Sequence, residues 1–173
     1  MKILVIREGF FSNLKDKVKN LSFKIKDKSI LAKKLYSIYI SKLCINLENS
    51  LKKENIDEDK IDSFMNKFNS YFNSNQMKNK YMKVANKEIE KKDEVFIIDD
   101  IIVAITLGLI TSIKLLIFEA IKTFIVIALT GITGFLSFKK IKEILNKSNE
   151  NTEKEMKTEL KNKSSKTYQS LMI

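Results

Sequence analysis

The chain has 173 residues, with one cysteine and no histidine, proline or tryptophan. A single cysteine excludes an intramolecular disulfide framework, and without histidine a two-cysteine, two-histidine zinc site cannot form. The net charge of +11 comes almost wholly from lysine, since Arg7 is the only arginine. We therefore expect solvated lysine faces or attraction to an anionic lipid surface. The scarcity of arginine argues against nucleic acid as a partner, because base recognition relies on arginine forks.

The first 96 residues are predicted to form an amphipathic helical module, because there is no proline and only four glycines in the chain to break helices. A helix capped by Ser12 or Asn13 is expected to run to about Lys28, and a second to begin at Ser29. A third, opening at Asp57 or Asp59, has aromatic residues at helical spacing. The candidate core residues of the module are Tyr36, Leu43, Leu47, Phe64, Phe68 and Phe72.

Two features of this module invite a functional interpretation, and each has a simpler structural one. The acidic cluster from Asp57 to Asp62 lacks the alternating ligands, central glycine and terminal glutamate of an EF-hand loop. It complements the dipole at a helix N-terminus. Cys44 lies at the edge of the apolar stripe and is most simply a small buried hydrophobic residue. A fourth helix is expected from about Gln76 to Phe96.

Residues 97–138 contain two apolar stretches, Ile101 to Phe118 and Thr123 to Phe138, joined by the four residues EAIK. A bilayer core needs about 20 apolar residues per helix, so stretches of 18 and 16 residues with lysines at their ends are just sufficient. The sequence therefore predicts a transmembrane helical hairpin. Its candidate residues are Ile101, Lys114, Phe118, Glu119, Lys122, Phe124, Gly131, Gly134 and Phe138.

Lys114 is the main cost of this prediction, because a lysine at the centre of a membrane helix costs about 2.5–3.5 kcal/mol. We expect its side chain to extend toward the Glu119 end of the hairpin. Two alternatives remain open for residues 97–138. They form a helix pair buried in a soluble bundle, with Glu119 and Lys122 paired on its surface, or a pair that switches between soluble and inserted states.

Gly131 and Gly134 place two small residues three apart, and small residues let transmembrane helices approach closely. Packing of the two hairpin helices on each other is the simpler explanation, and a self-association seam is the alternative. A homo-oligomer is therefore one of the expected partners.

Residues 139–173 are predicted to be a basic amphipathic turn followed by a polar helix or partly disordered tail. Lys139, Lys140 and Lys142 follow the apolar block directly and are expected at a membrane interface. Both flanks of the block are rich in lysine, so the positive-inside rule predicts that both termini are cytoplasmic.

Catalytic signatures are absent from the sequence: there is no histidine, nucleophile elbow, Walker loop or glycine-rich phosphate loop. We therefore expect no enzyme activity, cofactor or metal. The order of elements over residues 29–148, with amphipathic helices, an apolar hairpin and the basic turn GFLSFKKIKEILN, resembles colicin-type pore-forming domains, although no specific motif carries the resemblance. The polar tail, Lys114 and Glu119 depart from that layout.

Three functions remain open for this all-α chain. The first is an integral membrane protein whose hairpin anchors a cytoplasmic helical module for self-assembly or for binding a protein partner whose identity the sequence does not give. The second, which the colicin resemblance implies, is a membrane-permeabilising protein of toxin, effector or holin type. The third is a soluble helical interaction protein.

Overall fold

The computed structural model describes residues 25–91, 98–132 and 136–171, and the regular structure in these ranges is entirely α-helical. The predicted all-α class is confirmed. The helices are α2 (Ile25–Lys52), α3 (Glu58–Phe72), α4 (Asn75–Lys91), α5 (Ile98–Ile132) and α6 (Phe138–Leu171). The helix expected from residue 12 lies mostly outside the described residues. Contrary to prediction, no new helix begins at Ser29, because α2 runs through it.

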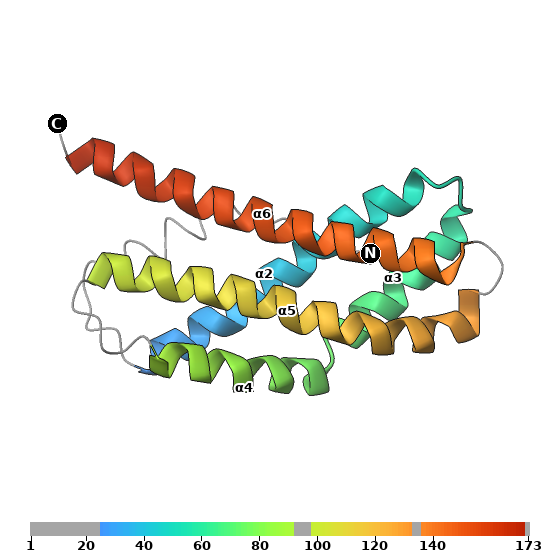
Figure 1. Cartoon of the computed structure of the whole chain (residues 1–173), viewed down its shortest axis with the longest axis horizontal. Helices are drawn as coiled ribbons and strands as arrows, with labels where there is room; N and C mark the ends of the chain where they lie inside the picture. Colours follow the sequence, from blue (N-terminus) through green and yellow to red (C-terminus); the bar gives the residue numbers. More distant parts are fainter. Residues whose placement is uncertain (1–24, 92–97, 133–135, 172–173) are drawn as a thin grey trace.

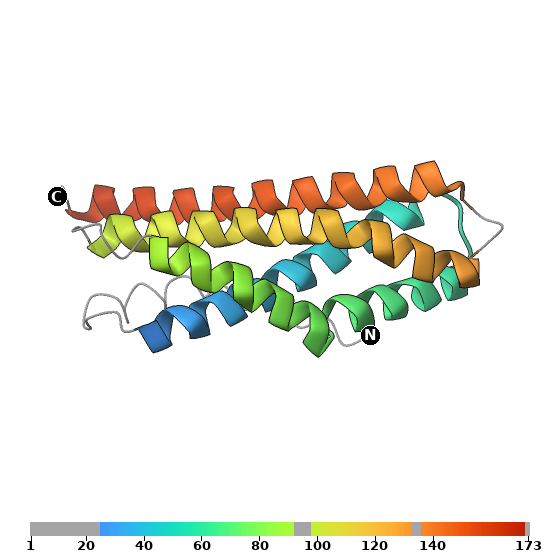
Figure 2. The same ribbon diagram turned by 60° about the horizontal axis from the view of Figure 1, so that its bottom comes forward.

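The helices form an elongated bundle with α5 at its centre (Figure 1). Helix α5 contacts α2, α3, α4 and α6. Helix α6 lies along the length of α5, while α2 crosses behind them obliquely, as the two views agree (Figures 1 and 2). Helices α3 and α4 follow one another beside α5, so that each covers a different part of it.

Local sequence sets the ends of α3 and the start of α4. Glu58 and Asp59 lie in the first turn of α3, where carboxylates complement the helix dipole. The backbone N–H of Asn73 donates to the carbonyl oxygen of Asn69 at 3.0 Å, and that of Ser74 donates to the carbonyl oxygen of Tyr71 at 3.2 Å, which closes the helix. The Ser74 hydroxyl then accepts a hydrogen bond of 3.3 Å from the Met77 N–H, as a helix-capping serine does.

Buried side chains from α2 to α6 belong to one hydrophobic cluster. The rings of Tyr36 (α2) and Tyr81 (α4) stack with centroids 4.8 Å apart. Phe124 of α5 lies among the aromatic side chains of α3, so a residue of the apolar block completes the aromatic face of the N-terminal helices. The division into segments 1–96, 97–138 and 139–173 stays a prediction. The six candidate core residues Tyr36, Leu43, Leu47, Phe64, Phe68 and Phe72 are all buried.

The apolar block differs from the predicted hairpin. Helix α5 is one continuous helix of 35 residues, and the expected turn at Glu119–Lys122 lies inside it. All four linking residues are tolerated in helix interiors, and no glycine or proline interrupts them. The hairpin on which the colicin resemblance depends is therefore absent from the fold.

The ends of the block also differ from expectation. Ile101 lies in the first turn of α5 and Gly131 in its last turn, while Gly134 lies outside the described residues. Phe138, predicted to end the second membrane helix, is instead the first residue of α6 and is exposed. Gly131 belongs to the same continuous helix as the first apolar stretch, so it does not lie between two helices of a hairpin.

Of the two forms left open for the C-terminal segment, the structure has the helix. Helix α6 spans 34 residues and packs on both α2 and α5. Apolar residues are sparse along it, and small or polar side chains fill the intervening buried positions. The buried residues of this stripe are Ile141, Ile144, Leu145, Ser148, Asn149, Thr152, Glu153, Met156 and Leu160.

Candidate functional site

The apolar part of α5 is the candidate functional element. Its segment Val103–Ala128, 26 residues long, is long and apolar enough to cross a bilayer, and 39% of its most apolar window is buried in the bundle. It is the single segment of the described ranges with this property. Length and composition alone do not separate a membrane span from the core helix of a soluble protein, so the surroundings of α5 have to decide.

One face of α5 is fully part of the bundle core. Ile113, Ile117, Ile121 and Phe124 are at most 1% exposed and recur at spacings of three and four residues. At the other end of the helix, a Cβ atom at Gly108 would lie 3.4 Å from a carboxylate oxygen of Glu88 on α4. That distance is an ordinary van der Waals contact with the end of a flexible side chain, so the contact between α4 and α5 there does not depend on the glycine.

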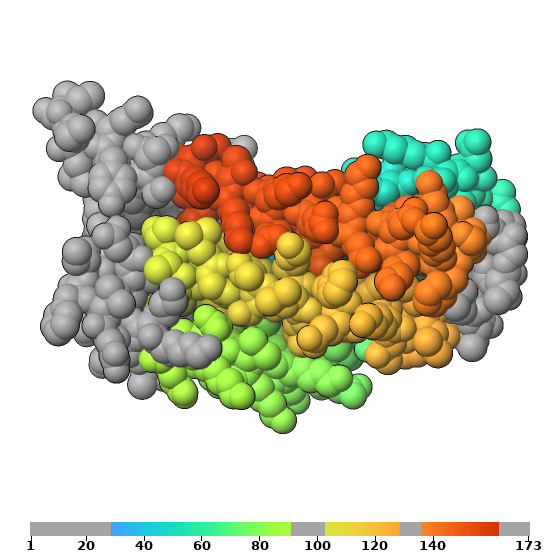
Figure 3. Space-filling view, viewed as in Figure 1, coloured from blue at the N-terminus to red at the C-terminus, as the bar shows by residue number. Residues whose placement is uncertain are grey.

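The opposite face of α5 is uncovered between α6 and α4 (Figure 3). We call this face the uncovered stripe. It contains large apolar side chains, since Leu115 is 57% and Val126 65% exposed, together with two exposed charged residues near its centre. Scattered apolar residues are ordinary on protein surfaces, whereas a row of them along one helix indicates a contact surface. The stripe consists of Leu115, Phe118, Glu119, Lys122, Val126 and Ile127.

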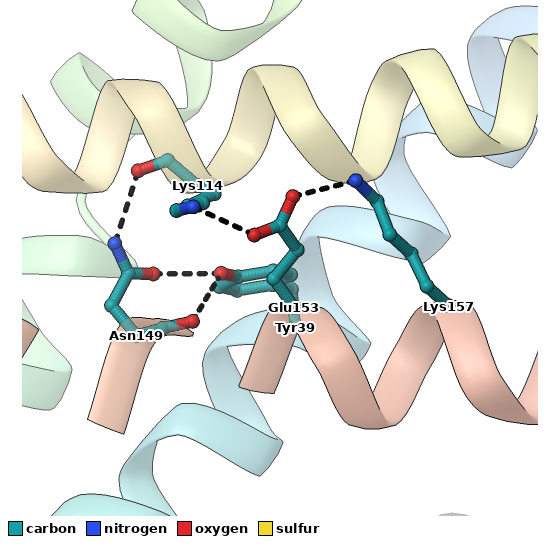
Figure 4. Close-up of polar contacts among 5 residues, drawn as sticks. All are labelled: Tyr39, Lys114, Asn149, Glu153 and Lys157. Carbon is teal, nitrogen blue, oxygen red and sulfur yellow. Dashed lines mark hydrogen bonds and ion pairs between the residues drawn. The ribbon is translucent and has the colours of Figure 1, made fainter. Parts of the chain in front are cut away.

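The prediction that the Lys114 side chain extends toward Glu119 is wrong. Lys114 of α5 instead enters a polar cluster between α2, α5 and α6 (Figure 4). Its Nζ atom lies 2.8 Å from Oε2 of Glu153 on α6. The other carboxylate oxygen of Glu153 lies 2.6 Å from Nζ of Lys157, one helical turn further along α6. One carboxylate therefore forms ion pairs with a lysine from each of two helices.

Tyr39 and Asn149 complete the cluster (Figure 4). The Tyr39 hydroxyl of α2 lies 2.7 Å from Oδ1 and 2.9 Å from the backbone oxygen of Asn149, and it donates a bifurcated hydrogen bond to these two acceptors. Asn149 Nδ2 donates to the backbone carbonyl of Lys114 at 3.1 Å. The five residues Tyr39, Lys114, Asn149, Glu153 and Lys157, which we call the polar latch, thus connect α2, α5 and α6.

The electrostatics of the latch favour its closed form. Burial raises the pKa of Glu153, but the hydrogen bonds and charges of Lys114 and Lys157 outweigh burial and hold that pKa below its ordinary value of 4.5. Burial, and secondarily the negative charge of Glu153, raises the pKa of Tyr39. At neutral pH, Glu153 is therefore a carboxylate and Tyr39 a hydrogen-bond donor, as the latch requires.

Further polar contacts attach α6 to α2. Lys42 of α2 pairs with Glu159 at 2.6 Å. Asn46 donates from Nδ2 to the Thr152 hydroxyl at 3.0 Å. Because ion pairs and neutral hydrogen bonds each contribute about 1 kcal/mol or less when partly exposed, these contacts hold α6 less strongly than an apolar seam would.

The three lysines expected at a membrane interface lie at the start of α6. Lys139 and Lys140 are exposed and Lys142 is partly exposed. Lys140 also pairs with Glu54 at 3.3 Å. The other residues predicted for the hairpin divide between the two faces of α5. Phe124 is buried in the core, whereas Phe118, Glu119 and Lys122 lie on the uncovered stripe.

Tyr39, Asn149 and Glu153 were not among the residues that the sequence singled out. A signal for the α6 residues does exist, because Asn149 and Glu153 continue the helical stripe from Leu145 to Met156 at spacings of three and four residues. The sequence nevertheless predicts that Asn149 and Glu153 lie on the surface, because polar and charged side chains are buried only when they have a hydrogen-bond or charge partner.

Comparison with known proteins gives no family for this chain: no protein-family model matches it, and no curated protein or solved structure is significantly similar to it. The geometry of α5 and its surroundings therefore carries the functional argument.

Proposed function

We propose that this protein is a membrane-inserting helical protein that carries one transmembrane helix, α5, within a bundle stable in water, and releases α5 into a bilayer. The observation that carries the proposal is the position of α5. A segment with the length and composition of a membrane span contributes one face to the core of the bundle, yet exposes an apolar stripe on its outer face.

The length of α5 fits a single span. Its 35 residues extend about 52 Å at 1.5 Å per residue, compared with about 30 Å for the hydrocarbon core of a bilayer. A single span places its two ends on opposite sides, so the expectation that both termini are cytoplasmic is not part of this proposal. The N-terminal helices and α6 would then flank the membrane from opposite sides.

Insertion requires α5 to separate from its neighbours. Helix α4 exposes four lysines (Lys78, Lys80, Lys83 and Lys87), and charged side chains cost several kcal/mol each in hydrocarbon. Helix α6 adds Glu153, which is bound to Lys114. The folded bundle therefore belongs in water, and the polar latch holds α5 there until the helices part.

The charge of the chain gives the bilayer a means of attracting the bundle. A net charge of +11 is drawn to anionic lipids, at about 1 kcal/mol for each lysine close to the surface. Lys139 and Lys140, both exposed at the start of α6, are candidates for this contact. Lipid phosphates can also replace Glu153 as partners of Lys114 and Lys157, which would open the latch without an acid trigger.

The test uses the absence of tryptophan from the chain. Val126→Trp places one fluorophore on the uncovered stripe of α5, and Val84→Trp places one on the outer face of α4. With vesicles containing anionic phosphatidylglycerol and acyl chains brominated near the bilayer centre, we expect strong quenching of the α5 probe and little quenching of the α4 probe.

Two results would contradict the proposal. Equal or absent quenching of both probes would show that α5 does not enter the hydrocarbon. A chain that folds only in detergent, and stays in the membrane pellet after carbonate extraction, would instead be a permanent anchor with no form stable in water.

Lys114 favours membrane permeabilisation as a second candidate function. Once α5 leaves α6, this lysine lies near the middle of the apolar segment without Glu153 beside it. Ionisable residues at such positions usually face a water-filled path or another helix. We expect vesicles to release a trapped dye when the protein binds, and Lys114→Leu to reduce release more than binding. Complete retention of dye at saturating protein would rule this function out.

A further inference from the structure

The uncovered stripe of α5 has an internal symmetry. Its central residues Leu115, Glu119, Lys122 and Val126 are separated by four, three and four positions, which is the spacing of a coiled-coil seam. All four side chains are exposed. Reversing the direction of the helix about the point between Ala120 and Ile121 exchanges the two apolar residues with each other and the acidic residue with the basic one.

We propose that this face binds a second copy of the chain, through an antiparallel contact between the two α5 helices. In that arrangement Leu115 lies against Val126 of the second copy, and Glu119 against its Lys122. The two-fold symmetry repeats both contacts, so one face is complementary to itself, as a symmetric dimer requires. A parallel pair would oppose Glu119 to Glu119 and Lys122 to Lys122.

The two charges favour a protein occupant over lipid for this face in the folded bundle. Facing acyl chains, Glu119 and Lys122 would both have to leave water. Facing a second copy, each meets the opposite charge at the centre of the contact. Exposed Phe118, which flanks the seam, adds apolar area beside it. Charge complementarity of this kind mainly sets the register and orientation of an interface.

This inference concerns the folded bundle in water and does not depend on insertion of α5 into a membrane. The dimer would cover the stripe before any bilayer is met. Because each copy has a net charge of +11, long-range repulsion opposes association and is screened by salt. We therefore expect the dimer dissociation constant to be lower at about 0.15 M salt than at about 0.01 M salt.

The experiment is sedimentation equilibrium of the full chain without lipid, over a range of concentrations. Glu119→Lys leaves two lysines on the seam, and Lys122→Glu leaves two glutamates. Each variant alone opposes like charges across the two-fold axis, so we expect its dimer dissociation constant to rise by at least about 10-fold. An equimolar mixture of the two variants restores opposite charges at both contacts, and we expect a heterodimer within about 3-fold of the original affinity.

Matched controls separate the seam from the overall charge. Glu90→Lys and Lys83→Glu, at exposed positions of α4, change the net charge by the same amounts as the two seam variants. They should leave most of the dimer intact. A monomer at all concentrations up to about 0.5 mM, well above common interface affinities, would overturn the proposal. So would a dimer that either seam variant leaves unchanged, or a mixture of the variants that stays monomeric.

Discussion

Replacing Phe124 with alanine tests whether α5 is the core of the bundle or a segment that the N-terminal helices can do without. The Phe124 side chain is fully buried. Its ring centroid lies 5.3 Å from that of Phe68, 5.5 Å from that of Phe64 and 5.8 Å from that of Phe72. Tyr71 adds a fourth ring at 5.6 Å. The substitution would leave a cavity at the point where these α3 side chains converge.

The expected loss is large relative to the stability of a domain this size. A buried phenylalanine replaced with alanine costs about 3–5 kcal/mol. Ring pairs at these distances each add about 0.5–1.5 kcal/mol beyond the buried area, which places Phe124→Ala in the upper part of that range. Domains are stable by about 5–15 kcal/mol in total, so this loss is a large fraction of the free energy of unfolding.

Urea unfolding of the full chain, followed by circular dichroism at 222 nm, measures this loss. With a slope of about 2 kcal/mol per molar urea, a loss of 4 kcal/mol lowers the midpoint by about 2 M. Phe118→Ala is the matched control, since Phe118 lies on the same helix but is 43% exposed. Its effect should stay within about 0.5 kcal/mol. Equal effects of the two substitutions would refute the packing of α3 on α5.

Three other predictions concern the latch and the buried phenol and thiol groups. Glu153→Gln should cost about 1–3 kcal/mol at pH 7, against almost nothing for the exposed Glu150→Gln. The pKa of Glu153 is lowered in the folded state, so its contribution to the free energy of unfolding is complete above pH 4.5 and is lost as the pH falls through the lowered pKa. The melting temperatures of Glu153→Gln and of the unmodified chain should therefore converge in acid. Among the described residues no group hydrogen-bonds the buried Tyr81 hydroxyl, whereas the Tyr36 hydroxyl donates to the Phe72 carbonyl. Tyr81→Phe should therefore keep or raise the melting temperature, while Tyr36→Phe should lower the free energy of unfolding by about 1 kcal/mol. Burial raises the pKa of the Cys44 thiol to about 12, and we expect thiol labelling at pH 8 to proceed no faster than the bundle opens; rapid labelling of the native protein would contradict the packing around α2.

The sequence by itself determined the helical class and the core of the N-terminal helices. Without proline, and with few glycines, the chain has little to interrupt a helix. The spacing of Tyr36, Leu43 and Leu47, and of Phe64 and Phe68, defines apolar stripes that are buried in the bundle. These features depend on the 3.6-residue period of a helix, which acts within one segment and needs no knowledge of its neighbours.

Only the tertiary structure decided how the apolar block is arranged. Each stretch on either side of Glu119–Lys122 is about as long as a membrane span, so the sequence pattern is the same for a hairpin and for one long helix. Helix α3 resolves this locally, because its aromatic residues surround Phe124 on the far side of the expected turn. A turn at Glu119 would carry Phe124 away from the line of α5, and its contact with the α3 rings would be lost.

Tertiary structure also decided the partners of polar residues far apart in the chain. Lys114 and Glu153 are 39 positions apart, and Tyr39 and Asn149 are 110 apart. No periodicity within one helix links such residues. Whether a lysine or an asparagine is buried depends on a charge or hydrogen-bond partner being in place, and that partner is brought there by the packing of α2, α5 and α6.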